Sequence, residues 1–142
     1  MRHVNFYAVT ILMLFLSGCT SQGCKPDKGT VLKGTDTAII GLYLDGNAYP
    51  QATVDKVIVH PGQKIILAGP EKFDILFKDQ KSPIGRLEIQ SSNGIVVIEI
   101  PKDIFERNQR ESKTTDMKKE LVYRYGIRVN GKVTDPEIVI RR

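Results

Sequence analysis

Apolar and polar residues alternate along most of the chain after residue 36, and this period of two is typical of half-buried β-strands. The pattern predicts about eight strands between Thr37 and Arg141, at residues 37–45, 57–59, 64–68, 73–78, 86–90, 95–100, 121–129 and 137–141. Turn-forming pairs such as Pro61-Gly62 and Asn130-Gly131 separate them. Short strands divided by such turns predict an all-β, Greek-key β-sandwich over residues 37–142.

The pattern also predicts which side of some strands is buried. In the strand at 121–129, Tyr123 and Tyr125 share an apolar face, and Arg124 and Arg128 lie on the opposite one. The segment 95–100 is apolar at five of its six positions, which predicts a strand buried on both sides. In the strand at 86–90, Leu87 and Ile89 are expected to point inward.

Residues 101–119 interrupt the strand pattern with a charged insertion. The segment has six basic residues and four acidic ones: Lys102, Arg107, Arg110, Lys113, Lys118, Lys119, Asp103, Glu106, Glu111 and Asp116. Pro101 and Asp103 are suited to the start of a helix. We therefore expect one short helix through about Arg110, followed by a solvated loop.

The N-terminus has the pattern of an export signal. Arg2 supplies a positive start, an apolar run follows over residues 4–16, and small residues close it at Ser17-Gly18. The run is shorter than the roughly 20 residues that a membrane-spanning helix needs. The alternative is a buried helix that belongs to the domain, but a run that begins at residue 4 and ends at small residues favours a signal over residues 1–18.

Leu16-Ser17-Gly18-Cys19 resembles the lipobox of bacterial lipoproteins. The resemblance implies cleavage before Cys19, acylation of that thiol and a stable lipid anchor. Thr20 stands where an Asp would favour inner-membrane retention, which implies an outer-membrane lipoprotein facing the periplasm. Residues 19–36 are then an acylated flexible tether. Cys24 is the remaining thiol, and it is either a tolerated tail residue or the site of an intermolecular disulfide.

Two segments are similar to the cupredoxins, the copper-binding β-sandwich family: 57–65, with its Pro-Gly turn, and 123–140, with its Tyr-rich strand and Asp-Pro break. Immunoglobulin-like sandwiches share much of this pattern. A blue-copper site needs two His, a Cys thiolate and usually an axial Met. Residues 120–142 contain none of these, and His60 precedes the turn instead of occupying the family's ligand position. We therefore expect the fold without its copper, and no cofactor.

Composition narrows the classes of function that remain possible. The chain has 142 residues, of which 41% are apolar and 26% charged, so it is long enough for one ordinary globular domain. It has two His and lacks a Gly-x-Ser-x-Gly motif, so the usual groups for acyl transfer are nearly missing. Asp74 and Asp79 are the one carboxylate pair to check for glycan hydrolysis. The mature chain has 20 Lys and Arg against 16 Asp and Glu without the basic and aromatic clustering of a nucleic-acid protein.

These observations favour a lipid-anchored, non-catalytic binding or assembly module of the bacterial envelope, with a protein partner. The expected interaction residues are Arg107, Arg110 and Lys113 in the charged insertion, together with Arg124 and Arg128 on the outer strand face. One alternative is an inhibitor of a cell-wall hydrolase, whose basic loop would enter an acidic active site. Another is a copper or redox protein with an atypical site.

Overall fold

The structure is a computed structural model that describes residues 30–31, 36–113 and 118–142, and the side chains within 30–31 are not described. The predicted signal at 1–18, the acylation site Cys19 and the second thiol Cys24 lie outside the described residues. Three residues of the segment predicted as a tether are described, and two of them, Thr30 and Val31, form a strand.

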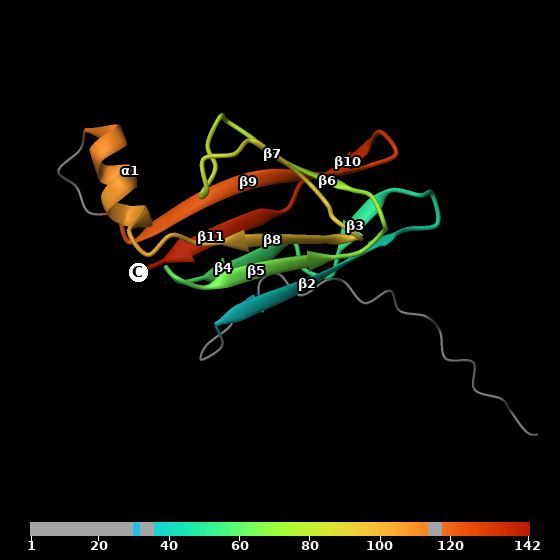
Figure 1. Ribbon diagram of the computed structural model, residues 1–142, viewed down its shortest axis with the longest axis horizontal. Coiled ribbons are helices and arrows are strands. Elements are labelled where there is room, and N and C mark those ends of the chain that lie inside the picture. Colours follow the sequence, from blue (N-terminus) through green and yellow to red (C-terminus); the bar gives the residue numbers. More distant parts are fainter. Residues whose placement is uncertain (1–29, 32–35, 114–117) are drawn as a thin grey trace, which may run out of the picture.

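Two β-sheets face each other and carry one helix at one end (Figure 1). The larger sheet contains β1 (Thr30–Val31), β4 (Lys56–Val59), β11 (Glu137–Arg141), β9 (Glu120–Val129), β6 (Asp74–Phe77) and β7 (Glu88–Gln90), in that order, with β10 (Lys132–Thr134) paired to β9. The smaller sheet has the order β3 (Pro50–Ala52), β2 (Thr37–Leu44), β5 (Lys64–Ala68) and β8 (Ile95–Glu99). The predicted all-β sandwich is confirmed.

The core lies between the sheets, because alternate residues of the strands point inward. Ile65 and Leu67 of β5 are fully buried, as are Ile75 of β6 and Ile127 of β9. Tyr125 fills the space beside Phe77, with their ring centroids 6.2 Å apart and the rings tilted. Burial raises the pKa of Tyr125, since the phenolate would lose its hydration there.

All eight predicted strands are present, and three short strands were not predicted. β3 and β10 have three residues each, and the segments that contain them were not predicted as strands. β1 has two residues and pairs in parallel with β4, matching Thr30 to Val57. Two residues of the segment predicted as a flexible tether, Thr30 and Val31, thus belong to the larger sheet.

The prediction that residues 95–100 are buried on both sides is wrong. β8 pairs with β5 alone among the described strands, and Ile95 and Val97 on its outer face are about half exposed. The register places Ile39, Ile66 and Val97 in one row across β2, β5 and β8. This outer face is apolar, and no described element covers it. The apolar run at 95–100 therefore did not indicate burial on both sides.

The charged insertion contains the predicted helix, α1 (Ile104–Ser112). Ile104 and Phe105 in its first turn are buried in the core, and Lys113 ends the helix in a left-handed conformation. α1 begins three residues after Pro101 and runs two residues beyond Arg110. In the part of the chain that the structure describes, no helix has the length and apolar character needed to cross a membrane.

Candidate functional site

A cleft of about 500 Å³ opens between α1, the connection from β6 to β7 and the start of β9. Three cations line it, namely Lys81, Arg107 and Lys118, together with the carboxylate of Glu111 and the ring of Tyr123. We call this feature the helix cleft. A concave site of this size falls within the range of ordinary ligand pockets.

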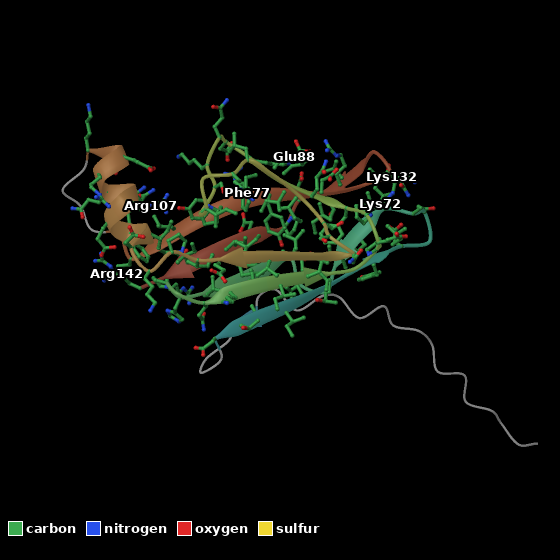
Figure 2. The ribbon with its side chains drawn as sticks, in the orientation of Figure 1. Lys72, Phe77, Glu88, Arg107, Lys132 and Arg142 are labelled. Carbon is green, nitrogen blue, oxygen red and sulfur yellow. The ribbon has the colours of Figure 1, made fainter. Side chains whose placement is uncertain are left out.

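One wall of the helix cleft is α1, which the core holds in place. Because Ile104 and Phe105 are buried, the next turns of the helix present Arg107 and Glu111 to the cleft at a spacing of four residues. The C-terminal residue Arg142 supports the helix from outside: its guanidinium lies 5.0 Å from the ring centroid of Phe105 and 3.6 Å from the carboxylate of Glu106. Arg107 and Arg142 both lie at this end of the sandwich, and Lys132 lies at the other (Figure 2).

The second wall is the connection between β6 and β7, which is held by contacts at its ends and in its middle. The backbone N–H of Phe77 donates to the carbonyl of Leu87 at 2.7 Å, which closes the base of the connection. The ammonium of Lys78 lies 2.6 Å from the carboxylate of Asp135. Pro83 is buried farther along. These contacts position Lys81 and Leu87 against the cleft.

Tyr123 is the most buried residue of the lining, with 6% of its surface exposed. Burial raises the pKa of its phenol, the nearby Glu111 carboxylate raises it further, and the Arg107 guanidinium acts in the opposite direction. The phenol is therefore neutral at physiological pH. Its titration responds to the two charged residues that α1 brings to the cleft.

The cations of the helix cleft are not neutralised from within the described structure. None of the described carboxylates forms an ion pair with Lys81, Arg107 or Lys118. Glu111 is the one carboxylate among the lining residues described. The lining therefore has a net positive charge, open to solvent and to a ligand.

Of the three interaction residues predicted in the insertion, Arg107 alone lines the cleft. Arg110 lies on another side of α1, where its guanidinium is 3.9 Å from the carboxylate of Asp103 and its Nε donates to the carbonyl of Glu106 at 3.4 Å. Lys113 is exposed at the helix end and is not among the lining residues.

The predicted face of β9 is separate from the cleft. Arg128 donates from Nε to Asp74 at 2.9 Å and from Nη2 to Glu88 at 2.6 Å, and we call these three residues the outer triad. The hydrogen bond that Arg128 donates to Asp74 is the main cause of its raised pKa. Arg124 is exposed on the same outer face of β9. The structure therefore does not bring the five predicted residues into one site.

Sequence reasoning did not select Lys81 or Lys118, although both line the cleft. Lys118 belongs to the charged insertion, so its region was identified without the residue itself. Lys81 lies in a turn-rich connection, where Asp79 and Gln80 adopt positive φ angles of 56° and 52°. Such a connection has no periodicity from which the direction of a side chain can be inferred.

The remaining chemical candidates are engaged elsewhere. Asp74 begins β6 and binds Arg128, whereas Asp79 follows the other end of that strand, so the two carboxylates are not set out as a catalytic pair. The Nδ1 atom of His60 lies 3.0 Å from the carbonyl oxygen of Arg141. Within residues 30–31, 36–113 and 118–142, no three His, Cys, Asp or Glu side chains are grouped as metal ligands.

Comparison with known proteins finds similarity in structure and none in sequence. No family model matches the chain, and no curated protein matches its sequence. A solved structure described as the NMR solution structure of a copper binding protein in the apo form is similar in fold. The similarity has 10% sequence identity and a TM-score of 0.39, and it covers 80% of this chain and 97% of the other. This chain is thus similar to that protein at a level that identifies neither its family nor its ligand.

Proposed function

We propose that this protein is a lipid-anchored, non-catalytic binding module of the bacterial envelope, and that it recognises a protein partner through the helix cleft. The observation that carries the proposal is the convergence of Lys81, Arg107 and Lys118 on one concave site without ion-pair partners among the described residues. Binding residues are commonly presented by loops and insertions on a rigid scaffold, as α1 is here.

The anchoring part of the proposal rests on the N-terminal sequence. Leu16-Ser17-Gly18-Cys19 after a charged start and an apolar run supports acylation of Cys19. Thr20 in the following position supports the outer membrane, with the sandwich domain in the periplasm. An anchor of this kind holds the domain near envelope partners, which raises the effective concentration for binding.

The groups within the cleft favour binding over catalysis. Both lining serines bond to the backbone of their own segments: Ser112 Oγ donates to the carbonyl of Asn108 at 2.8 Å, and Ser82 Oγ accepts from the N–H of Ile84 at 3.2 Å. A nucleophilic serine needs an adjacent base instead. The inhibitor hypothesis needs a projecting basic loop, whereas Ile104 and Phe105 fix the first turn of α1 on the core and Arg107 lines a concave site, so we favour recognition within the cleft.

Site-specific photocrosslinking in intact cells tests this proposal. A photoreactive amino acid at Asn108 probes the cleft, and the same group at the exposed Val133 of β10 is the matched control. We expect a discrete protein adduct from Asn108 that Val133 does not give, and we expect Cys19→Ser to release the protein from the membrane fraction. Identical adducts from both positions, or none, would overturn the assignment of the cleft.

A further inference from the structure

We infer that the helix cleft binds carboxylate side chains of an acidic segment in its partner protein. The inference rests on the proposed function and names the ligand chemistry of the same site. It begins with the charge of the lining, in which three cations face one carboxylate. An excess of positive charge in a concave site attracts anions and orients them as they approach.

The contrast between two arginines on α1 shows that this excess is local. Arg110 lies three residues after Arg107, and it contacts Asp103 and the backbone of Glu106. Arg107 has no such partner among the described residues and lines the cleft. A planar guanidinium that is not already engaged can bind a carboxylate through two parallel hydrogen bonds. Arg107 is therefore the residue we assign to direct carboxylate recognition.

The shape of the cleft favours a peptide over a membrane or a sugar. Anionic lipid headgroups present a flat surface, which suits a protruding basic patch more than a concave one. A sugar ring packs well on an open aromatic face, but the ring of Tyr123 is 6% exposed. Leu87 was expected to point inward, but it precedes β7 and is 45% exposed within the lining, where it offers an apolar contact beside the cations. An extended segment that mixes acidic and apolar side chains matches this combination.

Glu111 limits how much negative charge the cleft accepts. It lies four residues after Arg107 on the same face of α1, so a ligand carboxylate on Arg107 also experiences its repulsion. This repulsion falls more heavily on a dianionic phosphate than on a carboxylate. Removal of the Glu111 charge should therefore strengthen the binding of acidic peptides, which a merely structural role for Glu111 would not do.

The test uses the full-length protein in zwitterionic detergent micelles and the fluorescence anisotropy of labelled peptides. The acidic probe has the sequence Gly-Glu-Leu-Glu-Gly, and its control replaces both glutamates with glutamines. We expect the acidic probe to bind at least about tenfold more tightly than the control, with an affinity that falls as salt is added. Arg107→Ala and the double variant Lys81→Ala/Lys118→Ala should each weaken binding about tenfold, and Glu111→Gln should strengthen it.

Arg110→Ala is the matched control, because it removes the same side chain from the same helix outside the cleft. It should leave binding of the acidic probe unchanged within about twofold. Equal binding of both probes, or an equal effect of Arg107→Ala and Arg110→Ala, would overturn the inference. Arg107-dependent binding to phosphatidylglycerol vesicles or to a glucuronate tetrasaccharide, without binding of the acidic probe, would overturn it in favour of a lipid or a glycan.

The crosslinking and peptide-binding experiments together separate this inference from the proposed function. If crosslinks from Asn108 persist in cells while the acidic probe fails to bind, the partner site stands and the ligand chemistry is wrong. If the probe binds the cleft while Asn108 gives no adduct in cells, the carboxylate site stands and the partner assignment is wrong.

Discussion

The helix cleft and the outer triad each contain an arginine that the sequence predicted as an interaction residue, and they differ in whether the fold supplies its counter-charge. In the outer triad, Arg128 lies within 3 Å of the carboxylates of Asp74 and Glu88. In the helix cleft, Arg107 has no carboxylate within ion-pair distance among the described residues. A basic residue is thus available to a partner only where the fold has not supplied the acid itself.

Sheet register explains the difference. Asp74 on β6 is the antiparallel partner of Arg128 on β9, and β7 pairs with β6 on its other side and brings Glu88 close. Cross-strand pairs of opposite charge form wherever the register places them opposite one another. α1 lies beyond the ends of the strands, so no neighbouring strand places an acid opposite Arg107 (Figure 1).

The largest effect should come from removal of the helix anchor. Phe105→Ala leaves a cavity where a ring with 5% exposure packs in the core, and such truncations cost about 3–5 kcal/mol of unfolding free energy. Urea denaturation measures this loss. Because the ring also positions α1, the acidic probe should lose affinity under conditions where the variant is still folded. Val97→Ala, at a half-exposed position of β8, is the control and should change neither quantity appreciably.

Much of the fold followed from the sequence because alternation records which side of a strand faces the core. The eight predicted strands lie where apolar alternation and turn residues placed them, and α1 lies in the charged insertion after Pro101 and Asp103. The failures have physical causes. β1 has two residues and is defined by its pairing with β4, and the exposed faces of β8 and β2 bear apolar residues such as Val97 and Ile39. Neither the pairing of a two-residue strand nor the exposure of an apolar outer face follows from local periodicity.

The site was less predictable, because it depends on contacts between distant segments. Arg107, Arg110 and Arg128 looked equivalent in the sequence, and the difference between them arises from Asp103, Asp74 and Glu88. Lys81 reaches the cleft through an irregular connection whose direction no repeating pattern specifies. Charge was therefore a guide to the region, and folding determined which residue is available.

The next largest effect should follow when a substitution introduces a carboxylate into the lining of the helix cleft. Ser82→Glu places a carboxylate in the lining beside Lys81, as Asp74 and Glu88 already do for Arg128. We expect binding of the acidic probe to fall about tenfold by anisotropy, because the ligand then meets like charge and partly neutralised cations. Ser82→Gln loses the same serine hydroxyl without adding charge, so it is the matched control. Equal losses of affinity in both variants would show that the shape of the cleft, and not its charge, governs binding of the acidic probe.

The converse change should have a smaller effect. Asp74→Asn combined with Glu88→Gln removes both carboxylates from Arg128 and makes it an available cation. We expect a gain of about twofold to threefold in binding of the acidic probe, because isolated exposed charges contribute little. Adding Arg128→Ala to this double variant should abolish the gain. A gain that survives the third substitution would arise elsewhere on the surface.

The smallest effect to measure is a shift in the titration of Tyr123, which reports the electrostatics of the cleft without any ligand. Burial and Glu111 raise the pKa of this phenol above 10.0, and Arg107 opposes them. Arg107→Ala should therefore raise the pKa of Tyr123 further, Glu111→Gln should lower it, and Arg128→Ala should leave it unchanged. NMR titration of the tyrosine ring carbons, with Tyr123→Phe to assign the signal, follows each change.

The direction of this pKa shift also determines how the stability of the protein depends on pH. Because the folded pKa of Tyr123 is raised, the neutral phenol contributes stability that is complete below about pH 10 and is lost as the pH rises through the folded value. The loss should occur at higher pH in Arg107→Ala and at lower pH in Glu111→Gln. If neither substitution moved the titration, the charges on α1 would not act on Tyr123, and the contrast with the outer triad would lose its electrostatic basis.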